Sequence, residues 1–243
     1  MSPLISAHRG SCGVAGLPAA ERYDRAIGLG VDYVELDVRR TADGLYVNYH
    51  DDVTPSRRPP SSLTYKDLKA ELGSELLTLV EVLDVVAGRA GLHVDLKEPG
   101  DEAEIVSTVL GHDAGTRFVV TTGEVESIRT VKEHFPNVQA GLTLGTDLRD
   151  AQSWVTMTER LAELFPGPRL KRSHADFVAA HQQLARLRLL RYCKQNRLPA
   201  WVWTVDDTKE IARFMADPRV ATLVTNRPDI ALRMRAAGGI RTA

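Results

Sequence analysis

Short apolar runs alternate with longer amphipathic stretches along nearly the whole chain. The runs are rich in Val, Leu and Thr and commonly end at Gly, Asp, Asn or Lys, a pattern typical of buried β-strands. It predicts eight strands, at Leu4–His8, Tyr33–Val38, Leu92–Lys97, Phe118–Thr122, Ala140–Leu144, Ala175–Val178, Trp201–Val205 and Ala221–Thr225. The stretches between them predict helices at Pro18–Leu29, Leu79–Val86, Glu102–Leu110, Glu124–His134, Leu148–Leu164, Ala180–Asn196, Thr208–Met215 and Asp229–Ala236. Strands that alternate with helices in this way favour a parallel sheet.

The length of the chain indicates how that sheet closes. At 243 residues, eight strand–helix repeats fit a TIM (β/α)₈ barrel, which uses about 250 residues as one unit. A doubly wound open sheet is the competing architecture, but no Gly-rich dinucleotide turn follows the first strand. We therefore predict an α/β TIM barrel formed by a single domain over residues 1–243.

Composition and charge narrow the range of partners. Hydrophobic residues make up 43% of the chain and charged residues 26%, which is enough apolar surface for a large core. The 31 Lys and Arg nearly cancel the 32 Asp and Glu, so no general field attracts nucleic acid, and nucleic acid is not an expected partner.

Other features of the sequence bear on the compartment. No apolar run approaches the roughly 18 residues of a membrane span. The N-terminus has neither the basic nor the long apolar segment of a signal peptide. The two cysteines, Cys12 and Cys193, are expected as reduced thiols. Together these features predict a cytoplasmic protein without stable membrane insertion.

The most informative segment is the second predicted strand and its continuation. Glu35 and Asp37 are two residues apart and so point to the same face of a strand, which in a barrel is the interior near the C-terminal rim. Two carboxylates there repel each other and lose hydration unless a cation or a basic group compensates. The pair Asp43 and Gly44 signals a turn, and a β-hairpin centred near Ala42 and Asp43 returns His50 to a position roughly opposite Glu35. This hairpin is expected as an extension outside the eight barrel strands.

Two other predicted strands end in matching chemistry. The first delivers His8, Arg9 and Gly10, and the third places Asp95 and Lys97 on one face by its period of two. Hard carboxylate oxygens suit Mg²⁺ or Ca²⁺ better than zinc. Such a cation, together with an arginine and a lysine, predicts a site for an anionic, phosphate-bearing small molecule.

A series of short motifs runs in a fixed order along the chain: Ala7-His8-Arg9-Gly10, Gly30-Val31-Asp32-Tyr33-Val34-Glu35-Leu36-Asp37-Val38, Thr41-Ala42-Asp43-Gly44, His50-Asp51, Asp95-Leu96-Lys97, Trp203-Thr204-Val205-Asp206 and Thr225-Asn226-Arg227-Pro228-Asp229. In this order they resemble the glycerophosphodiester phosphodiesterase family. The resemblance spans nearly the whole chain and is most specific in its N-terminal part. It implies a TIM barrel that hydrolyses glycerophosphodiesters to an alcohol and glycerol 3-phosphate with a divalent cation.

The resemblance also implies roles for individual residues. Asp95 falls where the family usually has a glutamate ligand, and Lys97 matches a lysine on the phosphate side. One histidine is expected to remove a proton while the other supplies one, and a cation on three carboxylates is expected to stabilise charge on the phosphate. The predicted site therefore consists of the acid–base pair His8 and His50, the substrate- or phosphate-binding residues Arg9, Lys97 and Trp203, and the metal ligands Glu35, Asp37 and Asp95.

Two departures from the family pattern bear on substrate choice. Gly16-Leu17-Pro18-Ala19 stands where the family usually has Pro-Glu-Asn-Thr, so the glutamate and asparagine of that segment are missing. The Asp95-Leu96-Lys97 version has a ligand arm one methylene shorter and is similar to the related sphingomyelinase D-like phospholipases. Two alternatives to a glycerophosphodiesterase therefore stay open: a phospholipase D-type enzyme acting on lysophospholipid or sphingolipid, and a catalytically silent barrel that binds metal or phosphodiester.

Several candidate residues also have a structural interpretation. Arg9 is about equally suited to a salt bridge with a carboxylate, and Asp95 with Lys97 could form an internal ion pair. His93 is expected to be a buried structural group. Asp206 and Asn226 are as well suited to capping the helices that follow as to touching substrate. Surface or loop positions are expected for His112, His134, His174, His181 and the basic stretch Arg169–Arg172.

Overall fold

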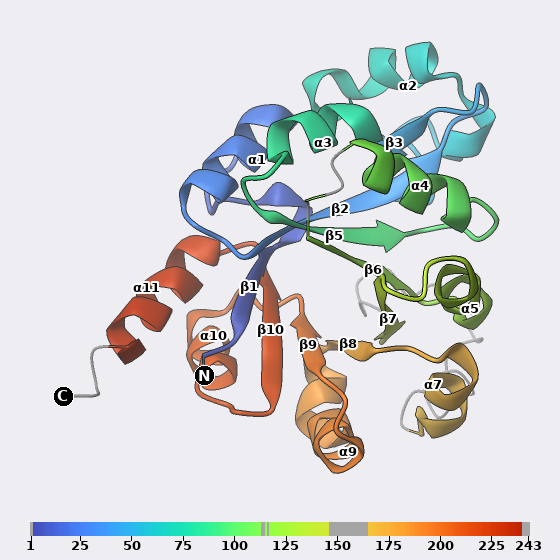
Figure 1. Cartoon of the computed structure of the whole chain (residues 1–243). Helices are drawn as coiled ribbons and strands as arrows, with labels where there is room; N and C mark the ends of the chain where they lie inside the picture. The colour runs from blue at the N-terminus through green and yellow to red at the C-terminus, as the bar shows by residue number, and fades with distance from the viewer. Residues whose placement is uncertain (1, 113–114, 116, 146–164, 240–243) are drawn as a thin grey trace.

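The computed structural model describes residues 2–112, 115, 117–145 and 165–239 (Figure 1). The predicted helix Leu148–Leu164 lies outside the described residues. Within them, the chain alternates between strands and helices from the first strand to the last helix.

Eight parallel strands close into a barrel, because the first strand pairs with both the second and the last. This closure confirms the predicted TIM barrel and excludes the open sheet. All eight strands lie where the apolar runs predict them, with the sixth shifted toward the C-terminus by a few residues. They are β1 (Leu4–Ala7), β2 (Tyr33–Arg40), β5 (Gly91–Leu96), β6 (Phe118–Thr122), β7 (Gln139–Leu144), β8 (Phe177–His181), β9 (Ala200–Trp203) and β10 (Val220–Thr225).

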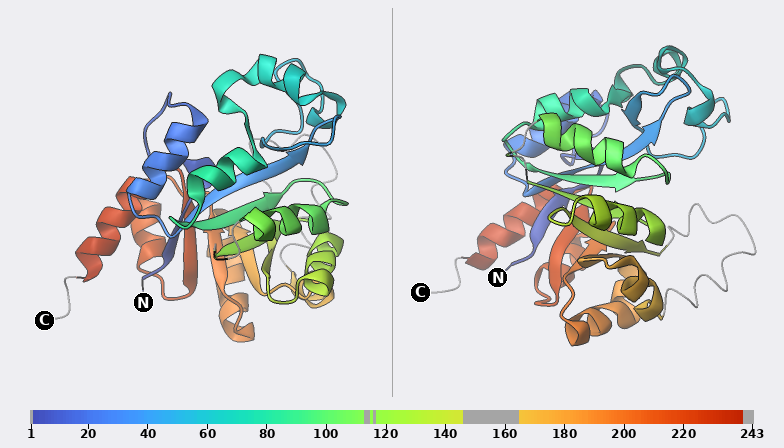
Figure 2. Two further views of the ribbon diagram at one scale, coloured as in Figure 1. Left: turned by 45° about the horizontal axis from the view of Figure 1, so that its top comes forward. Right: turned by 45° about the vertical axis from the view of Figure 1, so that its right-hand side comes forward.

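Helices pack around the outside of this barrel (Figures 1 and 2). Six lie where they are predicted: α1 (Ala19–Gly28), α3 (Leu79–Val86), α4 (Glu102–His112), α5 (Val125–His134), α10 (Thr208–Met215) and α11 (Pro228–Gly239). The predicted helix Ala180–Asn196 begins later and contains a π-helical turn at Ala185–Leu189 between α8 (Gln182–Leu184) and α9 (Leu190–Asn196).

Two helices are not predicted from the sequence. One is α2 (Tyr65–Leu72), where the Thr64 side chain accepts a hydrogen bond from Asp67 N and so caps the helix. The other is α7 (Gly167–Ser173), which contains the basic stretch Arg169–Arg172. The prediction of a solvated loop there is wrong, since the basic side chains decorate a short helix whose buried residues are Leu170 and Ser173.

The buried side chains form separate cores inside and outside the barrel. The larger one lies between the strands and the helices. The smaller one fills the barrel, where Trp201 stacks on Phe177 at 4.8 Å between ring centroids and meets Tyr33 at 5.2 Å. Gly141 makes room for Phe177, because a Cβ atom there would lie 2.2 Å from its ring. These aromatic rings form a solid floor, so a pocket can open only toward one end of the barrel.

The predicted hairpin extends β2 beyond the barrel. β3 (Tyr46–Asn48) pairs antiparallel with β2, and β4 (Leu77–Thr78) adds to its other edge. Gly44, with φ of 85°, makes the turn that the sequence signals. Val38 pairs with Asn48, and this register extended by two residues brings His50 opposite Leu36, one residue from the predicted position. The hairpin thus returns His50 to the rim.

The barrel is closed by a short seam between β1 and β2. Only Ser6 and Ala7 have partners on β2, whereas β2 and β5 share six pairs. Asp32 reinforces the seam, because its carboxylate accepts a hydrogen bond from Ile5 N at 2.8 Å and is ion-paired with Arg235 of α11. The first strand, the second strand and the last helix are therefore joined at one residue.

Two further expectations concern thiols and membranes. Cys12 and Cys193 are both buried and both free, and burial raises the pKa of the Cys193 thiol to about 12. In the part of the chain that the structure describes, no helix is both long and apolar enough to cross a membrane.

Candidate active site

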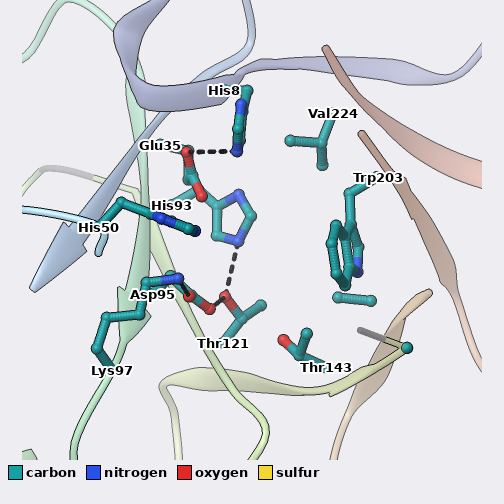
Figure 3. Close-up of a pocket in the computed structure, with 12 residues that line it drawn as sticks. His8, Glu35, His50, His93, Asp95, Lys97, Thr121, Thr143, Trp203 and Val224 are labelled. Carbon is teal, nitrogen blue, oxygen red and sulfur yellow. Dashed lines mark hydrogen bonds and ion pairs between the residues drawn. The ribbon is translucent and has the colours of Figure 1, made fainter. Parts of the chain in front are cut away.

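A pocket opens at the C-terminal ends of the barrel strands, above the aromatic floor (Figure 3). Its volume is about 250 Å³. One side is lined by ionisable groups from β1, β2, β5 and the hairpin, and the other by uncharged residues from β7 to β10. Six of the eight predicted site residues line it: His8, Glu35, His50, Asp95, Lys97 and Trp203.

The other two predicted residues, Arg9 and Asp37, do not line the pocket. Arg9 Nε is 3.4 Å from Asp37 Oδ2, and the side chain of Asp37 is only 2% exposed. Of the two interpretations of Arg9, the structure therefore shows the salt bridge with a carboxylate. The positive charge of Arg9 still lies close to the site, because Asp37 is one of its three carboxylates, with Glu35 and Asp95.

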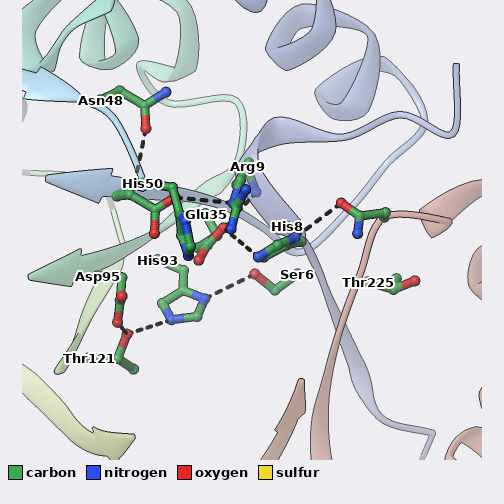
Figure 4. Close-up of polar contacts among 12 residues, drawn as sticks. Ser6, His8, Arg9, Glu35, Asn48, His50, His93, Asp95, Thr121 and Thr225 are labelled. Atoms are coloured by element: carbon green, nitrogen blue, oxygen red, sulfur yellow. Dashed lines mark hydrogen bonds and ion pairs between the residues drawn. The ribbon is translucent and has the colours of Figure 1, made fainter. Parts of the chain in front are cut away.

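The backbone at the end of β1 turns sharply and directs the backbone N–H of Arg9 toward the carboxylates. Arg9 and Gly10 both have positive φ, 51° and 64°. Gly10 is required because a Cβ atom would lie 2.7 Å from the ring of Tyr23 beneath it. The turn aims Arg9 N at Glu35 Oε2, at 2.5 Å (Figure 4). A strained non-glycine residue thus fixes the orientation of a buried carboxylate.

Three carboxylates converge because β2 and β5 pair in register, with Asp37 opposite Asp95 and Glu35 one step deeper. Lys97 bridges two of them, its Nζ lying 2.8 Å from Asp37 Oδ1 and 2.6 Å from Asp95 Oδ2. The internal ion pair that the sequence allows for Asp95 and Lys97 is therefore present, with Asp37 as a third member.

Burial and charge pull the pKa values of these carboxyls apart. Burial, with the nearby charges of Asp37 and Asp95, raises the pKa of Glu35 well above its usual range. Burial also opposes ionisation of Asp37, but Lys97, His50 and Arg9 outweigh it and lower its pKa to about 2. Asp37 is therefore firmly ionised, whereas Glu35 ionises only with a nearby positive charge.

Hydrogen bonds define which nitrogen of His8 carries the proton. Asp206 accepts from Asn226 Nδ2 at 2.9 Å, which turns Asn226 Oδ1 toward His8 Nδ1, 3.0 Å away. Because a carboxylate and an amide oxygen can only accept, Nδ1 carries the hydrogen in neutral His8 and Nε2 is left as an acceptor. Burial and Arg9 lower the pKa of His8 to about 4, so the ring is neutral at pH 7.

His50 is held in a similar way from the other side of the site. Its Nδ1 lies 2.8 Å from Asp51 Oδ1, which leaves Nε2 for the pocket. The side chain is 30% exposed, twice the 15% of His8. Two imidazoles on opposite sides of Glu35, each anchored through Nδ1, therefore face one cavity (Figure 4).

His93 is buried, as the sequence predicts, and belongs to a polar layer under the pocket. Thr121 Oγ1 donates to Asp95 Oδ1 at 2.6 Å, so it accepts from His93 Nε2 at 2.8 Å. His93 Nδ1 then accepts from Ser6 Oγ at 3.2 Å. The chain of bonds fixes the orientation of Asp95 from below.

The uncharged half of the pocket is formed by Trp203, Thr143 and small or apolar neighbours. Trp203 Nε1 and Thr143 Oγ1 are buried and have no hydrogen-bond partner among the described residues. The ring of His181 packs edge-on against Trp203, 5.3 Å between centroids. The prediction of a surface or loop position for His181 is wrong, because it ends β8 with 9% exposure, whereas His112, His134 and His174 are exposed.

The three carboxylates fit a divalent cation by their chemistry, although they are not grouped as a ready-made metal site. Within the described ranges, no three His, Cys, Asp or Glu side chains are close enough to hold a metal ion as they stand. Lys97 lies between two of the carboxylates instead. Asp37 Oδ1, however, is buried, and although it is ion-paired with Lys97 Nζ at 2.8 Å, it has no hydrogen bond of acceptable geometry. A buried, ionised oxygen of this kind is a suitable ligand for Mg²⁺ or Ca²⁺.

Three residues of the site are not assigned from the sequence. Asn226 and Asp206 orient His8 rather than capping helices, and the N-terminal cap of α10 is Asp207. Thr121 supports Asp95. All three are polar residues at or just after the C-terminal ends of strands, and this position is the feature of the sequence by which they could have been found. The sequence alone does not show that Asn226 contacts His8, because that requires knowing that β10 lies beside β1.

The chain matches a known family over most of its length. The model of the Glycerophosphoryl diester phosphodiesterase family matches residues 8–230. A glycerophosphodiester phosphodiesterase from Caldanaerobacter subterraneus subsp. tengcongensis is 24% identical over an alignment 260 residues long, gaps included, which covers 98% of this chain and 100% of that protein.

Solved structures share the fold. A glycerophosphodiester phosphodiesterase from Parabacteroides distasonis is similar with a TM-score of 0.76 and 20% identity, covering 98% of both chains. An Oleispira antarctica phosphodiesterase, solved in complex with the product sn-glycerol-3-phosphate, has a TM-score of 0.72 and 18% identity, covering 98% of this chain and 97% of that one. At these identities the likeness establishes the barrel alone.

Proposed function

Because this chain belongs to the glycerophosphoryl diester phosphodiesterase family, a family of phosphoric diester hydrolases, we propose that it hydrolyses glycerophosphodiesters by paired-histidine catalysis at a cation site. Water is added across the bond between phosphorus and the alcohol oxygen. The products are the free alcohol and glycerol 3-phosphate, the molecule bound as product in the Oleispira antarctica relative.

The observation that carries the proposal is the pair of oppositely placed imidazoles. His8 and His50 each use Nδ1 for an internal hydrogen bond, which leaves both Nε2 atoms for the same pocket. Acid–base catalysis of phosphoryl transfer needs one group to accept a proton and another to donate one across a single phosphorus centre. A catalytically silent barrel has no need of two histidines fixed in this way.

His8 is suited to be the base. Its lowered pKa keeps it neutral at pH 7, and its hydrogen bond to Asn226 leaves the Nε2 lone pair available. In the proposed reaction His8 Nε2 takes the proton from the attacking oxygen. His50 Nε2, on the opposite side of the carboxylates, gives a proton to the departing alcohol oxygen.

Two positive groups support phosphate binding in the proposed reaction. Lys97 lines the pocket, and the charges of Asp95 and Asp37 raise its pKa against the effect of burial, so it stays protonated. Arg9 does not line the pocket but is ion-paired with Asp37. We expect Lys97 to bind a non-bridging phosphate oxygen, since an ammonium at the pocket wall stabilises charge on that oxygen in the transition state.

A divalent cation would be held by Glu35, Asp37 and Asp95. When bound, it supplies Lewis-acid stabilisation of the phosphate charge. Glu35 would be ionised beside it, which offsets the cost of burying that carboxylate.

The direct test is glycerol 3-phosphate release from glycerophosphocholine and glycerophosphoethanolamine, with Mg²⁺, Ca²⁺ or chelator. The wild type should release product only with a cation. His8→Ala and His50→Ala should each lower kcat by about 10²-fold to 10⁴-fold, the usual contribution of a general acid or base. His134→Ala is the matched control, because His134 is exposed on α5, away from the barrel mouth.

The phospholipase alternative is tested in the same assay with lysophosphatidylcholine and sphingomyelin in micelles. Release of choline from these lipids, without glycerol 3-phosphate release from the deacylated substrates, would assign the lipid reaction instead. Full activity of either histidine variant would contradict the paired-histidine mechanism.

A further inference from the structure

Arg39 is a buried charge that the proposed mechanism does not use. It lies on β2 two residues beyond Asp37, and its side chain is only 6% exposed. It does not line the pocket. A guanidinium buried away from water needs several hydrogen-bond acceptors. The acceptors of Arg39 therefore show which segments of the chain it holds together.

Those partners come from two different loops at the rim. Arg39 Nη2 and Nε donate to the backbone carbonyl of His50 at 3.0 and 3.3 Å. Nη2 also donates to Asp52 Oδ1 at 2.5 Å, while Nη1 donates to Glu98 Oε1 at 2.7 Å. Glu98 directly follows Lys97. One side chain thus ties the loop that carries His50 to the loop that carries Lys97.

We propose that Arg39 is a positioning residue that holds His50 at its working distance from the phosphate. The consequence for catalysis rests on the proposed function, whereas the placement of the His50 ring does not. His50 follows β3 in a segment without further strand pairing, so its position depends on such contacts. Loss of the arginine should leave the pocket intact and let the His50 loop move.

The planar fork of arginine suits this task better than the ammonium of lysine. Its nitrogen donors point in fixed directions, which lets one side chain bind a carbonyl and two carboxylates at once. A lysine at this position could not reproduce that geometry. The proposal therefore predicts that Arg39→Lys behaves almost like Arg39→Ala.

The first experiment compares Arg39→Ala and Arg39→Lys with Arg40→Ala. Arg40 is the next residue, its side chain is half exposed, and it forms an exposed ion pair with Asp101 at 3.4 Å, so its loss should leave kcat within about twofold. Both Arg39 variants should lose about 10²-fold in kcat, the cost of misplacing a catalytic group by roughly 1 Å, with KM changed by less than about threefold.

Chemical rescue separates positioning from general damage. Guanidinium ions at millimolar concentration, far below the molar range that unfolds proteins, should raise the kcat of Arg39→Ala at least about tenfold and leave the wild type unchanged. A drop in kcat that guanidinium does not restore would overturn the positioning role.

A second readout does not depend on activity. Carbethoxylation by diethyl pyrocarbonate, followed by mass spectrometry of each histidine, should proceed at least about threefold faster at His50 in Arg39→Ala, with His8 unchanged. An unchanged rate at His50 would overturn the proposal even if the wild type hydrolysed none of the substrates. If Arg39→Ala does not fold, Asp52→Ala and Glu98→Ala each remove one partner and should raise the rate at His50 by a smaller factor.

Discussion

His93 is an imidazole whose burial links stability to pH. Burial lowers its pKa to about 4, despite the opposing charge of Asp95, while an unfolded histidine has a pKa of about 6.5. Below pH 6.5 the unfolded chain therefore binds a proton that the folded protein does not. The free energy of unfolding should fall as pH drops from 6.5 to 4, by up to about 3 kcal/mol from this residue.

Urea denaturation at intervals between pH 7 and pH 4 measures this effect. The residue that replaces His93 in His93→Gln cannot titrate, so unfolding of this variant should take up as much as one proton fewer than unfolding of the wild type. Its unfolding free energy should therefore depend less steeply on pH, even though its stability at pH 7 is lower. Equal slopes for the two proteins would show that folding does not shift the pKa of His93.

Some residues of the site could be predicted from the sequence and others could not. The positions of Glu35 and Asp37 on one face follow from the period of a strand. The roles of Asn226 and Arg39 do not, because each acts through contacts with a segment that is not its neighbour in sequence. Such contacts require the order and register of the strands to be known first.

At the scale of elements, a local cap stabilises the helix that follows the hairpin extension. Thr78 Oγ1 accepts from Glu81 N at 3.1 Å, and Glu81 Oε2 accepts from Thr78 N at 2.6 Å, so both ends of a capping box are present at α3. Thr78→Ala should lower the free energy of unfolding by about 1 kcal/mol.

Thr78→Ser is the matched control for that cap, because it keeps the hydroxyl. Thermal and urea unfolding of both variants should show the loss only in the alanine variant. A similar loss in the serine variant would mean that the methyl group of Thr78, and not the cap, supplies the stability.

Elements with a strong apolar period were predicted well, and the others were missed. The eight barrel strands are buried on both faces, so their apolar runs stand out. By contrast, α2 buries only Leu68, and α7 is rich in basic residues, with Pro168 and a serine at its ends. Their helical state depends on caps and on packing against the barrel, which a search for periodicity does not detect.

At the scale of the whole molecule, cation binding should stabilise the fold. A ligand that binds only the folded state raises the free energy of unfolding by about 2.7 kcal/mol at a concentration of 100 times its Kd. For a chain of this size that corresponds to a rise in Tm of roughly 5–10 °C. Calorimetry of the wild type with Mg²⁺, with Ca²⁺ and with chelator measures the shift.

Asp37→Asn removes the charge of a buried carboxylate among the three proposed ligands, and its Tm should not respond to either cation. Asp101→Asn, on the rim but outside the pocket, should keep the full response. A wild-type Tm that is the same with cation and with chelator would count against a resident cation.

The seam of the barrel has a consequence for how the protein is made. His8 follows the first strand, and the asparagine that orients it lies 218 residues later, at the end of the last one. A ribosome must therefore deliver the chain through Asn226 before this histidine can acquire its working tautomer. Until then β1 lacks its β10 neighbour and presents an unpaired edge, which is the kind of surface that chaperones protect. We expect nascent chains to stay inactive until β10 and Asn226 have left the ribosome.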